Sequence, residues 1–182
     1  MCLDVLKNPA AAIAKAKQKK DTNATIIKLF EISAIFAVAA TIITAKAAAN
    51  MSLVIGALLS SFSVFVIFAA VLGWVVRIAA VNLGGKGEYY EGFTAVTYAL
   101  APFAAGLLVI SLVTYVPVIG GLLSFLVVFP MLASALSILY RAVKDLYRTD
   151  MVTSLITVSI TTTVLVLALV FLSSSAMRLM ML

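Results

Sequence analysis

The side chains that usually carry catalysis or bind metals are scarce in this sequence. Its 182 residues include no histidine and one cysteine, which excludes imidazole chemistry, an internal disulfide and a thiolate cluster. Four carboxylates lie in polar connections between apolar stretches, namely Glu88, Glu91, Asp145 and Asp150. Because isolated carboxylates in loops are usually solvated, we expect neither an enzyme nor a metal or cofactor site.

Residues 82–92 combine several glycines with a lysine and are the most distinctive segment. A phosphate-binding loop needs a preceding strand, a longer glycine spacing, and Ser or Thr directly after the lysine. Here Gly87 and Glu88 follow Lys86, and apolar stretches of helical length lie on both sides. The glycines are more typical of a tight turn between two helices.

Polar and helix-breaking residues within the apolar stretches form a second group of candidate functional positions. They are Glu31, Arg77, Pro102, Pro130, Thr157 and Thr161. Glu31 and Arg77 lie near the ends of their stretches, where long side chains reach the membrane interface. Each proline predicts a kink in its helix.

Hydroxyl and small side chains along the apolar stretches allow two interpretations. Hydroxyls can line a water-filled conduit, but they more often bond a neighbouring helix or their own backbone. Small residues spaced by four also predict close helix packing. The pairs are Gly56 with Ser60, Ala69 with Gly73, Ala101 with Ala105, and Ala133 with Ser137.

The composition places most of the chain in lipid. Apolar residues make up 64% of the sequence, charged residues make up 11%, and the mean hydropathy is +1.21. A soluble domain has about 25% charged residues. A soluble fold of this size could not hide so much apolar surface, so an all-α membrane helix bundle is predicted.

Five stretches are long and apolar enough to cross a bilayer, which takes about 20 residues. They run over about residues 29–48, 51–80, 93–115, 118–140 and 151–172, with a hairpin turn at Pro117 between the third and fourth. With the N-terminus inside, only Lys46 and Arg178 of the 13 Lys and Arg residues lie outside. The positive-inside rule therefore predicts an N-in, C-out orientation.

Residues 1–28 form a basic segment ahead of the first span. Asn8 suits an N-cap and Pro9 the first helical position, so a helix is predicted from there to about Lys20. A weak apolar stripe opposite the lysines comprises Leu3, Leu6, Ala10 and Ile13. The segment either lies on the membrane surface or is a solvated tail that only sets orientation. A cleavable signal is a weaker interpretation, because the segment is long and contains acidic residues.

Residues 82–102 resemble a segment of the Yip family, membrane proteins named for interaction with Ypt/Rab GTPases. The similarity comprises the glycine-rich residues 82–87, then Thr94, then Tyr98-Ala99-Leu100-Ala101-Pro102. The resemblance is to prokaryotic-type members and would cover nearly the whole chain. It implies five spans, a cytoplasmic N-terminus and a short turn between the third and fourth spans. Eukaryotic members act in early secretory traffic and are implicated in membrane shaping. Their acidic-aromatic motif before the first span is absent here, so the resemblance does not extend to Rab binding.

Together these features predict a non-enzymatic, multi-pass integral membrane protein with a membrane-organising or scaffold role, in the cell membrane if prokaryotic. The alternative is a small-solute channel or transporter that uses hydroxyl-lined spans and kinked third and fourth helices. Expected partners are anionic headgroups and other membrane proteins, in homo- or hetero-oligomers, and not nucleic acid. The predicted contact residues are Lys15, Lys17, Lys19, Lys20, Lys86, Arg141, Lys144 and Arg148.

Overall fold

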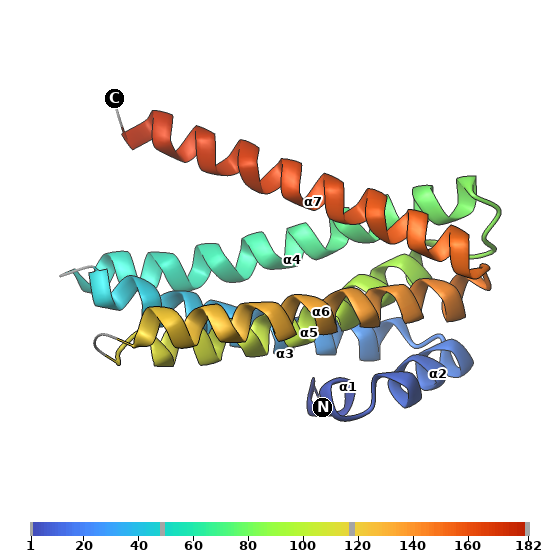
Figure 1. Cartoon of the computed structure of the whole chain (residues 1–182), viewed down its shortest axis with the longest axis horizontal. Coiled ribbons are helices and arrows are strands. Elements are labelled where there is room, and N and C mark those ends of the chain that lie inside the picture. The colour runs from blue at the N-terminus through green and yellow to red at the C-terminus, as the bar shows by residue number, and fades with distance from the viewer. Residues whose placement is uncertain (1, 48–49, 117–118, 181–182) are drawn as a thin grey trace.

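The protein is an all-helical bundle in a computed structural model that describes residues 2–47, 50–116 and 119–180, with side chains for residues 4–46, 50–116 and 119–168. These residues form seven helices and no strand: α1 (Cys2–Lys7), α2 (Pro9–Lys19), α3 (Thr22–Ala47), α4 (Met51–Asn82), α5 (Tyr89–Val113), α6 (Gly120–Tyr147) and α7 (Met151–Met180) (Figure 1). The five helices from α3 to α7 are long and apolar enough to cross a membrane. The predicted fold class and the count of five spans are therefore confirmed, while the N-in orientation stays a prediction.

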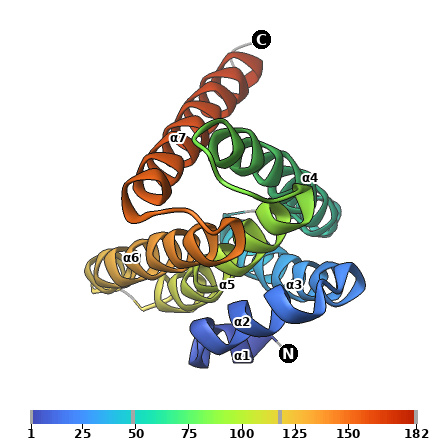
Figure 2. The ribbon, with the colours of Figure 1, turned by 90° about the vertical axis from the view of Figure 1, so that its right-hand side faces the viewer.

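The helix α5 lies at the centre of the bundle. Helices α3, α5 and α6 form a central row, with α1 and α2 on one side and α4 and α7 on the other (Figure 2). Helix α5 packs against α3, α4 and α6, and every residue from 91 to 99 is buried. The hydrophobic core is therefore centred on the first half of α5.

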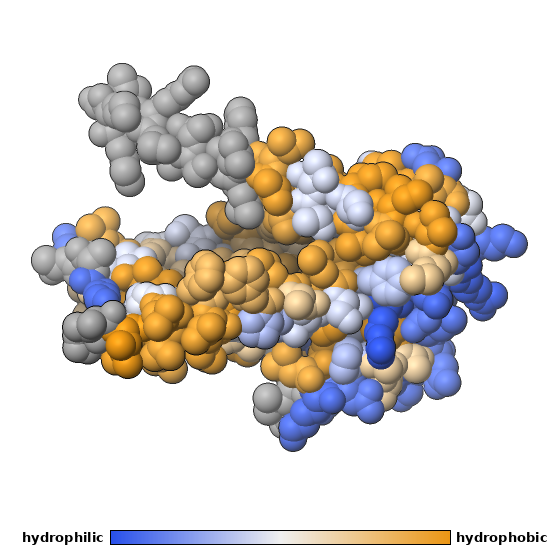
Figure 3. All heavy atoms as spheres, viewed as in Figure 1, coloured by the Kyte–Doolittle hydropathy of each residue, from blue (hydrophilic) through white to orange (hydrophobic). Residues whose placement is uncertain are grey.

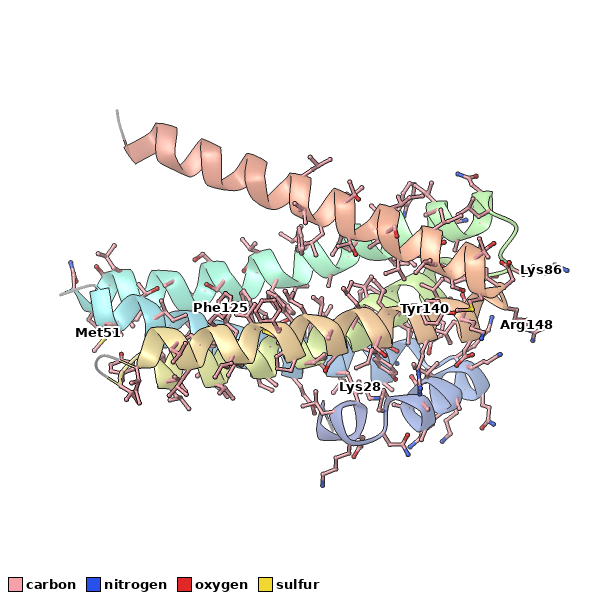
Figure 4. The ribbon with its side chains drawn as sticks, in the orientation of Figure 1. Lys28, Met51, Lys86, Phe125, Tyr140 and Arg148 are labelled. Atoms are coloured by element: carbon pink, nitrogen blue, oxygen red, sulfur yellow. The ribbon has the colours of Figure 1, made fainter. Side chains whose placement is uncertain are left out.

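The polar connections gather at one end of the bundle, which we call the basic end. There α4 and α6 end and α3, α5 and α7 begin, and the surface is hydrophilic, whereas the rest of the visible bundle is mostly apolar (Figures 1 and 3). Lys86 and Arg148 lie at this end and Met51 at the other (Figure 4). The 32 residues of α4 span about 48 Å, more than the roughly 30 Å of a hydrocarbon core. The basic end therefore reaches the headgroup layer or beyond.

The predicted N-terminal helix is present with its predicted cap. The Asn8 side chain accepts a hydrogen bond from the Ala11 N–H at 3.1 Å, and Pro9 occupies the first turn of α2. The helix ends at Lys19, and Lys20 adopts the left-handed conformation with φ 42°. This residue turns the chain sharply from α2 into α3.

The predicted apolar stripe of this segment is wrong in its register. Leu6 and Ala10 are exposed, Ile13 is buried, and Leu3 lies outside the residues with described side chains. The chain breaks at Asn8 into two helices, so one continuous helical period does not apply. The residues that bury against the bundle are Val5, Ala12, Ile13 and Ala16.

The connection between α5 and α6 runs from Thr114 to Ile119, and Pro117 itself lies outside the described residues. Pro102 lies buried inside α5, and Pro130 lies exposed inside α6. Because proline has no N–H, each leaves one carbonyl of its helix without its usual partner. The kinks themselves stay predictions.

Of the small-residue pairs, Ala69 with Gly73 lies where α4 crosses α5. A Cβ on Gly73 would lie 2.9 Å from the Phe93 Cα, closer than a real Cβ approaches. By contrast, both members of two other pairs are exposed and do not join helices within this chain. They are Gly56 with Ser60 and Ala133 with Ser137.

Candidate contact site at the basic end

A buried carboxylate, Glu91, ties three segments together in the first turn of α5. Its Oε2 accepts a hydrogen bond from the Glu88 N–H at 2.8 Å, and its Oε1 forms an ion pair with Lys20 Nζ at 2.9 Å. An acidic group here also complements the positive end of the α5 dipole. Glu91 therefore has a structural role, and it anchors the α2–α3 link to the start of α5.

The ion pair favours the charged form of Lys20. The hydrogen bond to Glu91, together with the charge of that carboxylate, raises the pKa of Lys20 above its ordinary value. A lysine whose pKa is raised by folding stabilises the folded protein at pH values below the ordinary lysine pKa. This stabilisation is lost as the pH rises through the raised pKa of the folded state. The Lys20 side chain is 62% exposed, so solvent screens this contribution strongly.

Tyr147, the last residue of α6, is fully buried beneath the glycine-rich turn. Its hydroxyl donates to the Glu88 carbonyl at 3.0 Å, and its own carbonyl accepts from the Lys86 N–H at 2.9 Å. A Cβ on Gly87 would lie 2.6 Å from the Tyr147 ring. The tyrosine thus fixes the turn between α4 and α5 on the end of α6.

The glycines of this segment allow a left-handed backbone at one position and close packing at the others. Gly84 adopts φ +91°, which favours glycine. A Cβ on Gly85 would lie 2.8 Å from the Ala80 carbonyl oxygen, and one on Gly92 would lie 2.4 Å from the Gly73 carbonyl oxygen. The tight helix–helix turn expected from the sequence is confirmed, and within it Gly85 is buried while Gly84 is exposed.

Two further polar residues of the 82–102 segment, Thr94 and Tyr98, contact α3. The Thr94 and Thr25 hydroxyls lie 3.5 Å apart, and Lys28 Nζ donates to the Tyr98 hydroxyl at 2.7 Å. Lys28 Nζ also lies 4.4 Å from the centre of the Tyr98 ring, a cation–π contact. These contacts continue the polar seam that Glu91 begins.

A pocket of about 330 Å³ lies at the basic end, and we call it the basic pocket. Four of its lining residues are cations from four separate segments: α2, the α2–α3 link, the glycine-rich turn and the α6–α7 connection. They are Lys17, Lys20, Lys86 and Arg148. Glu88 and Glu91 also line the pocket, so cations exceed carboxylates by two.

The remaining predicted contact cations lie elsewhere. Lys15 and Lys19 line a second cavity between α2 and α3. Arg141 and Lys144 are exposed on α6 and line neither space. Of the eight predicted cations, the structure therefore gathers four in one pocket.

The predicted intramembrane positions are distributed over five helices. Glu31 on α3 is half-buried and lines the cavity beside α2, and Arg77 on α4 is half-buried near the start of α5. On α7 both predicted threonines are buried: the Thr161 hydroxyl donates to the Thr157 carbonyl at 2.8 Å, and the Thr157 hydroxyl has no partner among the described residues. Pro102 and Pro130 lie on α5 and α6.

Most hydroxyls on the long helices bond their own backbone. Thr41 donates to the Ala37 carbonyl at 2.7 Å, and Ser159 donates to the Leu155 carbonyl at 2.9 Å. This pattern favours the packing interpretation over a hydroxyl-lined conduit.

Comparison with known proteins agrees with this architecture. The model of the Yip1 domain matches residues 3–173, which is nearly the whole chain. The chain belongs to the Yip family. No curated protein and no solved structure matches it. The Yip family is a family of non-enzymatic membrane proteins, and the five long helices place this member in contact with the lipid bilayer.

In this Yip-family protein, sequence reasoning missed the roles of Glu91 and Tyr147. A Glu three residues after Glu88 at the start of an apolar run is a recognisable helix-start signal. Tyr147 carried no such signal, because nothing in the local sequence shows that the end of α6 meets a turn 60 residues away.

We expect replacement of Glu91 by Leu to lower stability by about 1–3 kcal/mol, since the Glu88 N–H would lose its buried acceptor. Glu91→Gln should cost less, because an amide oxygen can still accept that hydrogen bond. Thermal unfolding of the purified protein in detergent measures both. Asp145→Asn, which changes an exposed carboxylate on α6, is the matched control. Equal effects of the Leu and Gln variants would contradict the capping role.

Proposed function

We propose that this Yip-family protein is a membrane-organising scaffold whose basic end gathers anionic lipid headgroups. The observation that carries the proposal is the convergence of Lys17, Lys86 and Arg148 on one pocket. These cations come from segments far apart in the sequence, so the fold itself assembles the pocket. A phosphate group that contacts several cations at once forms strong charge-assisted hydrogen bonds.

The carboxylates that could serve a membrane enzyme have structural partners instead, and this supports the proposal. Glu91 caps α5 and pairs with Lys20, and the Asp150 side chain accepts from the Thr153 N–H at 3.1 Å at the start of α7. The hydrogen bond to Thr153 also lowers the pKa of Asp150. Both carboxylates are thus engaged in building helix ends.

The proposal includes the N-in orientation, which would place the basic pocket on the cytoplasmic leaflet. That leaflet carries the anionic lipids and attracts each nearby lysine or arginine by about 1 kcal/mol. Homo- or hetero-oligomers of the protein would then concentrate such lipids locally. The exposed cations Arg141 and Lys144 would widen the attractive surface on α6.

The test is binding of the protein, held in nanodiscs of phosphatidylcholine, to vesicles that contain phosphatidylglycerol. Combined Lys17→Gln, Lys86→Gln and Arg148→Gln substitutions should remove about 3 kcal/mol of attraction, or about 100-fold in affinity. Lys20 is kept because of its ion pair with Glu91. Flotation of the nanodiscs with the vesicles measures the change.

Two controls accompany this experiment. Lys46→Gln removes one cation at the other end of the bundle and should leave vesicle binding unchanged. Added salt should weaken binding of the unaltered protein, because exposed charges are screened. Vesicle binding that is equal in the unaltered protein and the triple variant would overturn the proposal.

A further inference from the structure

A second and larger cavity lies between the N-terminal helices and the bundle. Its volume is about 580 Å³, within the range of small-molecule sites. Helix α2 packs against α6 and α5, while α1 packs against α5 and α3. The space between α2 and α3 remains open as a consequence, and we call it the lateral cavity.

The lateral cavity is lined by charges of both signs. The cations come from α1, α2 and α3 and are Lys7, Lys15, Lys19 and Lys28. The carboxylates come from α1, the α2–α3 link and α3 and are Asp4, Asp21 and Glu31. A simple anion would meet three carboxylates here, and a simple cation would meet four ammonium groups. Charge complementarity therefore favours a ligand that carries both signs.

One wall of the cavity is held in a fixed geometry. Lys28 is half-buried, and its ammonium is held on the Tyr98 hydroxyl and ring. Asp21 accepts from the Ala24 N–H at 3.0 Å, and a carboxylate retains further acceptor sites after one such bond. Figure 4 shows Lys28 between α3 and the N-terminal helices. Lys28 and Asp21 are thus positioned before any ligand arrives.

We propose that the lateral cavity binds the headgroup of one zwitterionic phospholipid of the phosphoethanolamine class. The phosphate lies against Lys28 with Lys15 and Lys19, and the primary ammonium donates hydrogen bonds to the carboxylates. A primary ammonium has three donors, whereas the quaternary ammonium of choline has none. Phosphoethanolamine therefore uses both kinds of lining group.

The position of the cavity fits a lipid. Charged groups are costly in the hydrocarbon core, so the cavity belongs at headgroup level. On α3, Ile27 lines the cavity and is 59% exposed, and Phe30 beside it is 48% exposed. The acyl chains would continue from this apolar rim along the lipid-facing side of α3.

Native mass spectrometry of the full chain in detergent, with added lipids of matched acyl chains, tests this site. We expect one phosphatidylethanolamine per chain, bound about tenfold more tightly than phosphatidylcholine or phosphatidylglycerol. Lys28→Gln should weaken retention of all phospholipids. Glu31→Gln and Asp21→Asn should weaken phosphatidylethanolamine alone, and Asn at position 21 keeps the acceptor for the Ala24 N–H. If one of these variants does not fold, Tyr98→Phe is used in its place, because it removes only the hydroxyl that accepts the hydrogen bond from Lys28.

The outcomes separate this inference from the proposed function. Lys86→Gln in the basic pocket should reduce binding to phosphatidylglycerol vesicles and leave retained phosphatidylethanolamine unchanged. Equal retention of the three lipids, or no effect of the Lys28 and Glu31 variants, would overturn the lateral site while leaving the basic pocket intact. Binding of free phosphoethanolamine without retention of the lipid would also overturn the lipid assignment.

Discussion

Replacing Gly92 by valine is expected to abolish recovery of monodisperse protein. A Cβ at this position would lie 2.4 Å from the Gly73 carbonyl oxygen and 2.8 Å from the Tyr147 hydroxyl. The first neighbour is helical backbone and cannot move aside. Overpacking a core usually costs about 1–3 kcal/mol and more where backbone must shift. Since α4, α5 and α6 all meet here, we expect a loss at or above the top of that range.

Size-exclusion chromatography of a fluorescent fusion in detergent, followed by thermal unfolding, measures this loss. The matched control is Gly56→Ala, also a glycine in a long helix, where a Cβ would meet nothing within 4 Å. Because alanine is favoured over glycine in helices by about 1 kcal/mol, Gly56→Ala should be neutral or stabilising. Gly92→Val protein with the elution and melting temperature of the unaltered chain would show that α4 and α5 do not approach as closely as described.

Replacing Tyr147 by alanine is expected to produce the second large effect, a loss of about 3–5 kcal/mol. The ring is fully buried and covers Gly87, and the hydroxyl donates to the Glu88 carbonyl. Tyr147→Phe keeps the ring and should cost only about 1 kcal/mol, the usual net value of a hydrogen bond. Thermal unfolding in detergent separates these two contributions.

The truncation control for Tyr147 is Phe129→Ala on the same helix. The Phe129 ring is 59% exposed toward lipid, so its removal should change stability much less. The Tyr147→Ala variant should also weaken vesicle binding, because Lys86 and Arg148 would lose their fixed positions. Equal destabilisation by the two alanine variants would mean that the basic end is not organised around Tyr147.

The sequence was sufficient for features that depend on composition and local spacing. Five apolar stretches predicted the five long helices, because lipid requires each span to satisfy its own backbone. Asn8 and Pro9 predicted the start of α2, because capping is a contact within one turn. Residues 82–102 suggested the Yip family, and the family model confirms that membership over nearly the whole chain.

Features that depend on distant contacts could not be predicted in the same way. The stripe through Leu6 and Ala10 was wrong, because the break at Asn8 changes which face of each helix meets the bundle. The cations Lys17, Lys86 and Arg148 are far apart in sequence, and only the packing of the helices shows that they share a pocket. Tyr147 gave no local signal of its contact with Gly87.

The two halves of the bundle differ in what surrounds their side chains. Buried residues of α4 lie between Phe65 and Ala80, and most of those of α6 lie between Ile138 and Tyr147, all toward the basic end. Toward the other end, the same helices present side chains such as Leu53 and Leu122 to lipid. Because those side chains have acyl chains for neighbours, we expect that half of α4 and α6 to adapt to a thinner or thicker bilayer more readily than the protein-packed half.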